Sequence, residues 1–322
     1  MASVAFASKL NTSRFSLLTR QTRKHVLMPQ TRRLAYKCFQ RPTISNPNIQ
    51  PGHTFPLSTK LYTTQPNMAG TPAELQQTLT PALIEDIQKF WFDHLSDDKS
   101  LVLPGQSEMK RWFSTDHDFD KACVAQFQPA LETILASNAT ASDILSAVDT
   151  KNPLTWLSLL ILLDQVPRNC YRGPASKQVF TRFDPLASEI ALRAIDLGIP
   201  FQNPIRYRLS YRFWFHLPLM HSEDVHVHYR AVEVHEETAR DLEAFLKLEK
   251  DSLGEDEKAC FDVLFQKQES MRAWLANTAD FEKRHLVIVE QFGRYPHRNA
   301  AIGRVSTEEE VRYLEDGGET FA

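Results

Sequence analysis

From Thr80 onward the apolar residues recur at intervals of three and four, and this spacing constrains the fold more than any other feature of the chain. Such intervals gather apolar side chains on one face of a helix, whereas a half-buried strand needs strict alternation, of which no useful length occurs. The pattern predicts a single all-α domain over residues 71–322. Helices joined by short turns favour an irregular antiparallel bundle or a stack of helical repeats, and no clean period of about 34 residues is present.

Capping residues followed by proline predict where several helices begin. This combination occurs at residues 80–81, 152–153 and 184–185, and each proline suits the first turn of a helix. The second of these helices is apolar on nearly every side between Trp156 and Leu163, so we expect it at the centre of the core and ended by Pro167. It is shorter than the roughly 20 apolar residues of a membrane span, so no transmembrane segment is expected.

The C-terminal half predicts further helices. Ser222 is expected to cap a long charged helix that runs to about residue 250. Residues 255–276 and 277–292 have the pattern of a helix pair, and residues 306–309 have the composition of a capping box for a last short helix.

The front of the chain differs in charge from the rest. Residues 1–70 hold ten Lys or Arg and no Asp or Glu, whereas residues 71–322 hold 27 basic and 40 acidic residues. A basic, hydroxyl-rich and acid-free start is typical of a mitochondrial transit peptide, so we expect residues 1–40 to direct the chain to the mitochondrial matrix. The alternative is a basic arm that binds anionic surfaces. The acidic body disfavours nucleic-acid binding, which needs a basic surface.

A linker without fixed structure is expected between the basic start and the helices. Residues 41–70 are rich in Pro, Ser, Thr and Asn and lack a periodic apolar pattern. Met68 lies just before the helical part. Initiation at this methionine would produce a second, cytosolic form that lacks the transit segment.

Three connections contain more Asp, His, Arg and Asn than a turn between helices requires. They span residues 164–173, 217–224 and 292–304. The first and the third both follow an apolar helix, and both have Arg-Asn shortly after a proline. Because arginine can satisfy carbonyl groups at the end of its own helix, a purely structural role is the simplest alternative to a functional one.

These turns lie among motifs that resemble the family known as domain of unknown function 924. The matching segments are Phe90-Trp-Phe92, Trp112-Phe113, Leu163-Asp-Gln-Val-Pro-Arg-Asn169, Tyr171-Arg-Gly173, Pro218-Leu-Met-His-Ser-Glu-Asp224 and Phe292-Gly-Arg-Tyr-Pro-His-Arg-Asn299. The similarity continues to Gly317-Gly318. The resemblance implies a tetratricopeptide-like helical fold. It implies no reaction, because the family is named for lacking one.

Motifs for metals, nucleophiles and phosphate loops are weak or missing in the sequence. One cluster of potential metal ligands consists of His216, His221, Glu223, Asp224, His226 and His228. Its spacing does not match HExxH, and the four cysteines are widely separated. Neither GxSxG nor a glycine-rich phosphate loop occurs. We therefore expect no metal and no cofactor.

A pocket for an anion is the leading functional hypothesis. Arginine offers bidentate donors to carboxylate or phosphate, and histidine and carboxylate side chains supply acid–base groups. The expected catalytic residues are Asp164, His221 and Glu223. The expected ligand-binding residues are Arg168, Asn169, Arg294, His297, Arg298 and Asn299. In this hypothesis Arg168 and Arg298 share one concavity with His221, and the protein is an enzyme that acts on a small anionic metabolite.

The alternative function is a tetratricopeptide-like scaffold that binds a protein partner without catalysis. One structural observation separates the two hypotheses. In an enzyme, the three polar turns should converge on one pocket. In a scaffold, they should be scattered, and residues of successive helices should line a groove.

The localisation hypothesis is testable with a fusion. We expect a fluorescent protein fused to residues 1–67 to enter mitochondria, because this segment is basic and free of acidic residues. A chain that starts at Met68 should stay outside mitochondria and still fold. Cytosolic or secretory localisation of the fusion, seen by fluorescence microscopy, would contradict the hypothesis.

Overall fold

A computed structural model describes residues 72–321 of the protein. The expected transit segment, residues 1–40, and the expected linker, residues 41–70, lie outside this range. Helices dominate the described residues and no strand occurs among them, which confirms the all-α class. None of the helices within this range is long and apolar enough to cross a membrane.

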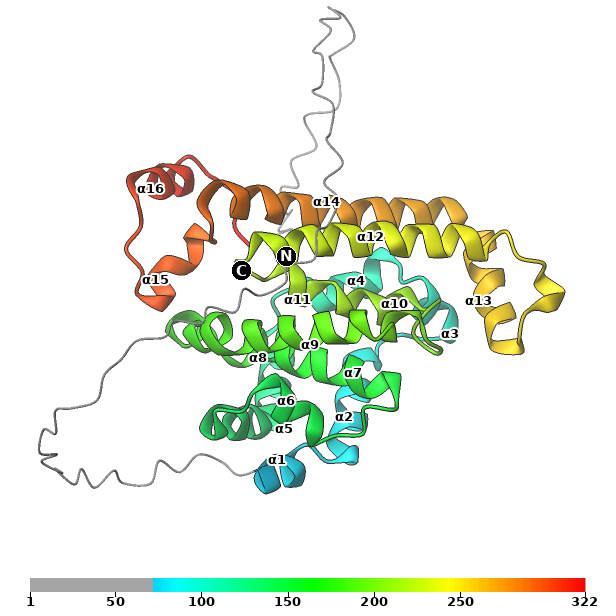
Figure 1. The fold of residues 1–322 in the computed structure, drawn as a ribbon, viewed down its shortest axis with the longest axis horizontal. Coiled ribbons are helices and arrows are strands. Elements are labelled where there is room, and N and C mark those ends of the chain that lie inside the picture. The colour runs from blue at the N-terminus through cyan, green and yellow to red at the C-terminus, as the bar shows by residue number, and fades with distance from the viewer. Residues whose placement is uncertain (1–71, 322) are drawn as a thin grey trace, which may run out of the picture. The chain divides into compact units, whose positions relative to one another are not determined.

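The helices of residues 72–321 are arranged in three tiers in the view of Figure 1. The lowest tier contains α1 (Pro72–Thr78), α2 (Pro81–Phe92), α5 (His117–Ser137) and α6 (Ala141–Ser146). The middle tier contains α7 (Pro153–Leu160), α8 (Val166–Cys170), α9 (Asp184–Asp196), α10 (Leu209–Arg212) and α11 (Leu217–Met220). Two short helices, α3 (Asp98–Val102) and α4 (Gln106–Phe113), follow α2.

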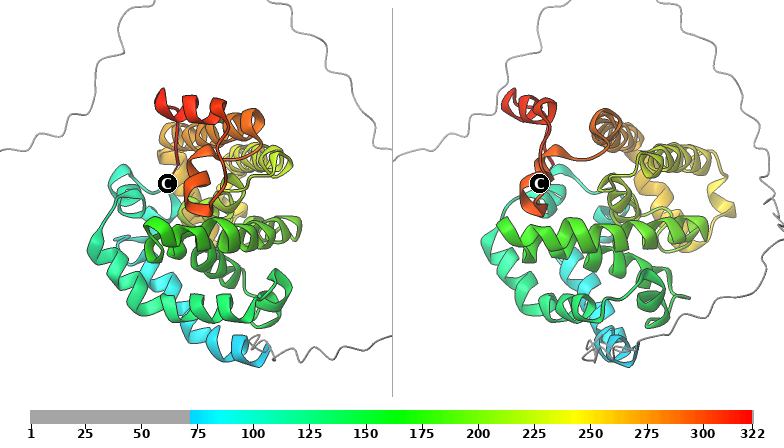
Figure 2. Two further views of the ribbon diagram at one scale, coloured as in Figure 1. Left: turned by 90° about the vertical axis from the view of Figure 1, so that its left-hand side faces the viewer. Right: turned by 60° about the vertical axis from the view of Figure 1, so that its left-hand side comes forward.

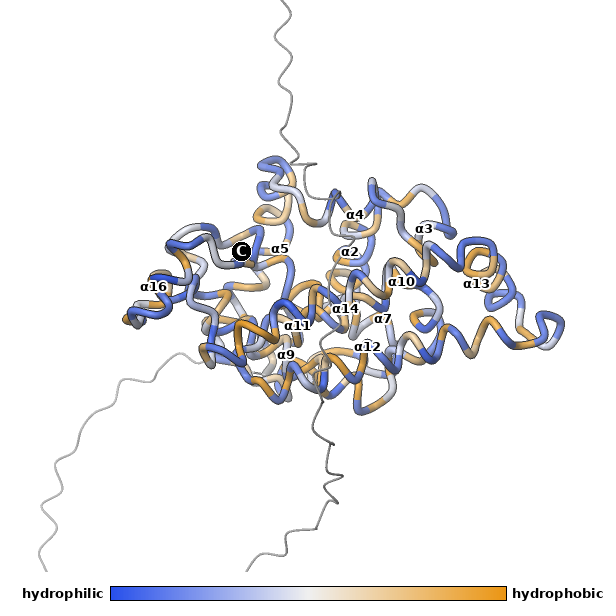
Figure 3. Tube along the Cα trace, turned by 90° about the horizontal axis from the view of Figure 1, so that it is seen from above, coloured by the Kyte–Doolittle hydropathy of each residue, from blue (hydrophilic) through white to orange (hydrophobic). Residues whose placement is uncertain are grey.

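The upper tier is a long helix pair. Its members are α12 (Val225–Phe245) and α14 (Gln268–Phe292), which lie side by side (Figure 2). At one end of the pair the chain passes through α13 (Glu255–Gln266), and at the other end it continues into α15 (Asn299–Ile302) and α16 (Glu308–Glu315). Both long helices alternate between hydrophobic and hydrophilic stretches, as expected when one face of each is buried (Figure 3).

Local capping signals explain the start of α2 and α7. The Thr80 hydroxyl accepts a hydrogen bond from the Leu83 amide at 3.2 Å, and the Asn152 side chain does the same for the Leu154 amide at 3.0 Å. In both helices a proline occupies the first turn, as predicted. These starts depend on neighbouring residues only, which is why the sequence predicts them well.

The central helix continues beyond the point where Pro167 was expected to end it. After α7 the chain forms a π-helical turn, Ile161–Gln165, and then enters α8, in whose first turn Pro167 lies. The Val166 amide donates to the Ile161 carbonyl, one residue further back than in an α-helix. A π turn leaves one carbonyl group without a helical partner, so the missing N–H of proline costs little at this position.

A second π-helical turn makes another prediction wrong. Residues 184–185 do not open a helix, because a π-helical turn, Val179–Phe183, runs directly into α9. Asp184 therefore has helical backbone angles and does not act as a capping residue. The two π turns carry Asp164 and Asp184 into the interior, where the residues are 1% and 3% exposed.

Two predicted boundaries near the long helix pair are wrong. The capping residue of α12 is Asp224, whose carboxylate accepts from the His226 amide at 2.9 Å, and the helix ends at Phe245 instead of near residue 250. The predicted break at Asn277 is also absent, because the buried face of α14 stays in phase from Met271 to Val289.

The remaining C-terminal predictions are close to the observed structure. The last capping box is formed by Thr307 and Glu310, one residue later than expected. Helix lengths range from four residues in α11 to 25 in α14. The described residues therefore contain no regular repeat of helix pairs of similar length. The tetratricopeptide-like description is therefore not confirmed, whereas the irregular helical bundle agrees with the structure.

Burial of the central helix generates a stability prediction. Trp156, Leu160 and Leu163 are 3%, 0% and 0% exposed, as expected from the sequence. Leu160→Ala should lower the free energy of unfolding by about 2–5 kcal/mol, because it leaves a cavity in the core. Leu197 is 62% exposed, so Leu197→Ala should change it by less than about 0.5 kcal/mol. Equal effects in urea unfolding would contradict this description of the core.

Candidate functional site

A buried carboxylate, that of Asp164, lies at the centre of the candidate site. Its Oδ1 accepts from His221 Nδ1 at 2.7 Å and lies 3.5 Å from Arg168 Nη2. Its Oδ2 accepts from Gln165 Nε2 at 2.5 Å. Burial opposes ionisation of Asp164, but the contacts with His221 and Arg168 outweigh it and hold the pKa of Asp164 below its usual value. The carboxylate is therefore ionised at neutral pH.

This carboxylate determines which nitrogen of His221 is free. An ionised acceptor beside Nδ1 holds a proton on that atom, so Nε2 is the ring nitrogen left for other contacts. No hydrogen bond to Nε2 is formed by any residue in the range 72–321. The side chain of His221 is 14% exposed, so a ligand can reach it.

A second buried carboxylate, that of Asp184, joins two arginines from distant parts of the chain. Its Oδ1 accepts from Arg168 Nη2 at 2.5 Å, and its Oδ2 lies 3.3 Å from Arg298 Nη1. The same Nη1 of Arg298 donates to the His221 carbonyl at 3.0 Å. The Arg298 guanidinium also lies 4.5 Å from the centre of the Tyr295 ring. Arg168, His221 and Arg298, which come from the three polar turns, are thereby held together.

A cavity of about 330 Å³ lies next to this cluster. Arg168, Asn169 and His221 are among the residues that line it. Asp164 and Arg298 are behind its wall, where they are 1% and 3% exposed. The first two polar turns therefore border the cavity, whereas the third lies behind it. The expectation that Arg298 shares one concavity with Arg168 and His221 is wrong, because Arg298 is buried and does not line the cavity.

Glu223 does not lie at the cavity. Its two oxygens accept from Arg304 at 2.6 and 2.8 Å, and Oε1 also accepts from the Tyr295 amide at 3.0 Å. Burial opposes ionisation, but these donors lower the pKa of Glu223. The geometry therefore gives Glu223 a role in ordering the turn around Tyr295, away from the cavity at His221.

Three expected ligand-binding residues lie in the same outer region. Arg294 donates to both oxygens of Glu310, at 2.5 and 2.7 Å, and Asn299 Nδ2 lies 3.2 Å from Glu310 Oε2. The His297 ring lies 5.6 Å from that of Tyr295, and burial lowers the pKa of His297 to about 4. These residues hold α15 and α16 in position, and none of them lines the cavity.

The cluster fits an ion-pair network better than a metal site. Potential ligand atoms of Asp164, Asp184 and His221 lie within 4.8 Å of one another. However, the Arg168 guanidinium already lies 2.5 Å from Asp184 and 3.5 Å from Asp164. A divalent cation at this point would be repelled by the positive charge that the two carboxylates share.

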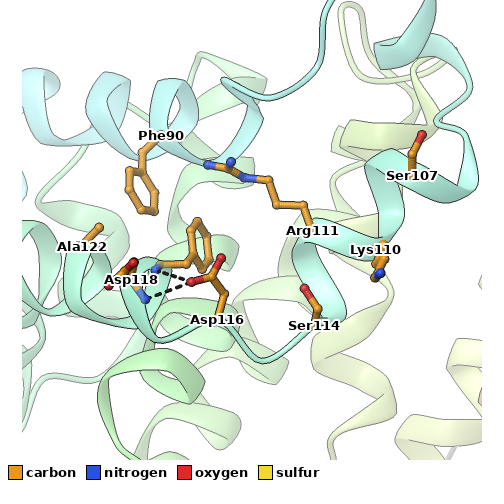
Figure 4. Close-up of a pocket in the computed structure, with 9 residues that line it drawn as sticks. Phe90, Ser107, Lys110, Arg111, Ser114, Asp116, Asp118 and Ala122 are labelled. Atoms are coloured by element: carbon orange, nitrogen blue, oxygen red, sulfur yellow. Dashed lines mark hydrogen bonds between the residues drawn. The ribbon is translucent and has the colours of Figure 1, made fainter. Parts of the chain in front are cut away.

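A second pocket, of about 540 Å³, lies between α2, α4 and α5 (Figure 4). Asp116 caps α5 there by accepting from the amides of Asp118 and Phe119, at 2.9 and 3.2 Å. Arg111 pairs with Asp93 at 3.0 Å. Because Asp116 and Arg111 already serve a helix cap and a surface ion pair, this pocket is a weaker functional candidate than the cavity at His221.

Sequence reasoning missed several residues of the site. Asp184 was interpreted as a helix cap, and Gln165 was not singled out. The aromatic residues Phe281 and Phe321, which line the cavity, belong to segments that carry no polar motif. The pairs Asp164-Gln165 and Asp184-Pro185 can be seen in the sequence. Whether they lie close together depends on how α8 and α9 pack.

The described fold and site define a helical protein with a buried Arg–Asp–His cluster beside a small cavity. The chain belongs to the family described as "bacterial protein of unknown function (DUF924)", whose model matches residues 87–318. It is similar to a protein of unknown function from Agrobacterium tumefaciens, at 27% identity over 73% of this chain and 98% of that chain, with a TM-score of 0.48. No curated protein matches the chain.

The ion-pair network predicts the effect of a conservative change. Arg298→Lys keeps the charge but loses the planar group that contacts Asp184, the His221 carbonyl and the Tyr295 ring together. It should lower the free energy of unfolding by about 1–3 kcal/mol. Arg240→Lys, at an exposed pair with Glu236, should cost less than about 0.5 kcal/mol. Equal stability of the two variants would show that the network does not stabilise the fold.

Proposed function

We propose that this protein is an enzyme that uses His221 as an acid–base group on a small anionic molecule bound in the 330 Å³ cavity. His221 Nε2 takes a proton from the substrate or from a water molecule beside it. Asp164, bonded to Nδ1, holds the ring in position and stabilises the imidazolium that forms. The proton then returns to the product from Nε2.

The observation that carries the proposal is a contrast between two histidine–carboxylate pairs. His228 Nδ1 lies 2.6 Å from Glu282, but His228 Nε2 contacts the Ser222 carbonyl at 2.8 Å, and the His228 and Glu282 side chains are both 0% exposed. His221 forms a similar carboxylate contact, yet its Nε2 is free among the described residues and its side chain borders the cavity. The proposal therefore assigns catalysis to His221 and a structural role to His228.

The positive charge of the residues that line the cavity favours an anionic substrate. The Arg168 side chain is 19% exposed, whereas its partners Asp164 and Asp184 are 1% and 3% exposed. Arg168 lines the cavity, whereas the neutralising carboxylates do not. Arginine donors in a fixed orientation suit a carboxylate or a phosphate.

The scaffold hypothesis receives less support. In that hypothesis the three polar turns were expected to be scattered, but Arg168, His221 and Arg298 are joined through Asp184 and the His221 carbonyl. This convergence supports the proposal of a ligand site. The proposed location of the enzyme is the mitochondrial matrix, with a cytosolic form when synthesis starts at Met68, and this part rests on the composition of residues 1–70 alone.

Turnover in a complex mixture tests the proposal without a known substrate. The full chain is incubated with a cellular small-molecule extract, and consumed compounds are identified by mass spectrometry. We expect the wild type to consume at least one acid, and His221→Gln to slow this by about 10²–10⁴-fold. His226→Gln, on the exposed side of α12, is the matched control and should retain the wild-type rate. A wild type that consumes nothing, or an equally active His221→Gln, would contradict the proposal.

A further inference from the structure

The cavity beside His221 is lined by two chemically different groups of residues. One group is polar and contains Gln165, Arg168, Asn169 and Arg172. The other is apolar and largely aromatic, with Trp112, Phe113, Leu217, Met220, Phe281 and Phe321. A short, fully polar metabolite would leave the apolar group in contact with water, so the lining itself restricts the class of ligand.

The polar group presents positive charge that is held in place. Arg172 donates to both oxygens of Asp120, at 3.3 and 2.8 Å, while half of its side chain stays exposed. Arg168 is fixed by Asp184 at 2.5 Å, and its buried Nε has no hydrogen-bond partner among the described residues. Both guanidinium groups are therefore oriented before a ligand arrives, which lowers the entropy that binding costs.

The aromatic group includes rings that the fold leaves exposed. Phe113 and Phe281 are 56% and 48% exposed, although burial of an aromatic ring would be favourable. Phe113 is stacked on Trp214, with ring centres 6.1 Å apart, and the Arg284 guanidinium lies 4.6 Å from the centre of the Phe281 ring. Ordered, exposed rings at one cavity are typical of a surface that a ligand covers.

The C-terminal tail supplies a third ring. Phe321 is stacked on His285, with ring centres 3.5 Å apart and an angle of 19° between the planes. Burial lowers the pKa of His285 to about 2, so this ring adds a flat neutral surface and no charge. Glu319 pairs with Arg284, and its carbonyl accepts from the Tyr313 hydroxyl at 3.0 Å, which holds the tail beside the cavity.

We infer that the ligand of this cavity is a small carboxylic acid with a flat apolar body. Its carboxylate contacts Arg168 and Arg172, and its body lies among the rings of Phe113, Phe281 and Phe321. The inference rests on the proposed function only in taking this cavity as the ligand site. Both parts of the ligand are required, because the charge contacts alone and the ring contacts alone each leave one group of the lining uncovered.

Three probes of matched structure test the inference by thermal shift on the full chain. Phenylacetate carries both parts, acetate carries only the charge, and phenylacetamide carries the ring without the charge. Phenylacetate should raise the Tm in a saturable way, since it binds the native state, and the other two should not at equal concentration. An equal shift with acetate or with phenylacetamide, or no shift with phenylacetate, would overturn the inference.

Variants locate the bound probe. Phe281→Ala should weaken phenylacetate binding about tenfold, because one ring contact is lost. Phe265→Ala is the matched control, since Phe265 is 52% exposed in α13 and does not line the cavity. Phe321→Ala should act like Phe281→Ala, and each variant is compared with its own unliganded Tm. Equal binding by Phe281→Ala and Phe265→Ala would show that the probe binds elsewhere.

The inference and the proposed function can fail separately. If phenylacetate binds as expected but no compound in the extract is consumed, the acid–base chemistry is wrong and the ligand class stands. If the protein consumes an acid that lacks an apolar body, while phenylacetate causes no shift, the ligand class is wrong and the chemistry stands.

Discussion

The contact on which the rest of the site depends is the buried carboxylate of Asp184 between two arginines. Arg168 precedes Asp184 in the sequence and Arg298 follows it. Their guanidinium nitrogens lie 2.5 and 3.3 Å from the two carboxylate oxygens of Asp184. Breaking a buried pair by removing one partner leaves an uncompensated charge, which costs about 3–5 kcal/mol. Arg168 in turn approaches Asp164, and Arg298 donates to the His221 carbonyl. The position of His221 therefore follows from this ion-pair network.

The two π-helical turns explain how the carboxylates reach the interior. Asp164 lies within one turn and Asp184 directly follows the other, and a proline comes soon after each. Each turn inserts one extra residue into the helix, which changes the direction of the side chains that follow. π turns of this kind are often found at functional sites. Here they bring two acidic side chains into a helical core that would otherwise exclude them.

The predictability of the structure differs between local and distant features. Thr80 and Asn152 were identified as caps because a capping hydrogen bond involves residues two or three positions away. The roles of Pro167 and Asp184 were misjudged, since proline normally ends or starts a helix and only the π turns reverse this expectation. Packing of one turn against another decides whether such a turn forms.

The same division applies to the candidate site. The grouping of Arg168, His221 and Arg298 was predicted from similar residues at helix ends, and the structure brings these three together. Glu223 and Arg294 were expected beside them, but Arg304 and Glu310 form closer pairs with these two residues. Only the tertiary structure shows which of several residues of the same charge forms the ion pair. The spacing of residues in the sequence gives no information about this pairing.

The central claim is that ionised Asp164 holds the proton of His221 on Nδ1 and leaves Nε2 to the cavity. Proton NMR tests this directly, because an imidazole N–H that donates a hydrogen bond to a carboxylate gives a signal far downfield of most other protons. We expect one such signal to disappear in both Asp164→Asn and His221→Gln, while the signal of the buried His228–Glu282 pair, with its 2.6 Å contact, remains as an internal reference. A spectrum that is unchanged by Asp164→Asn would contradict the account.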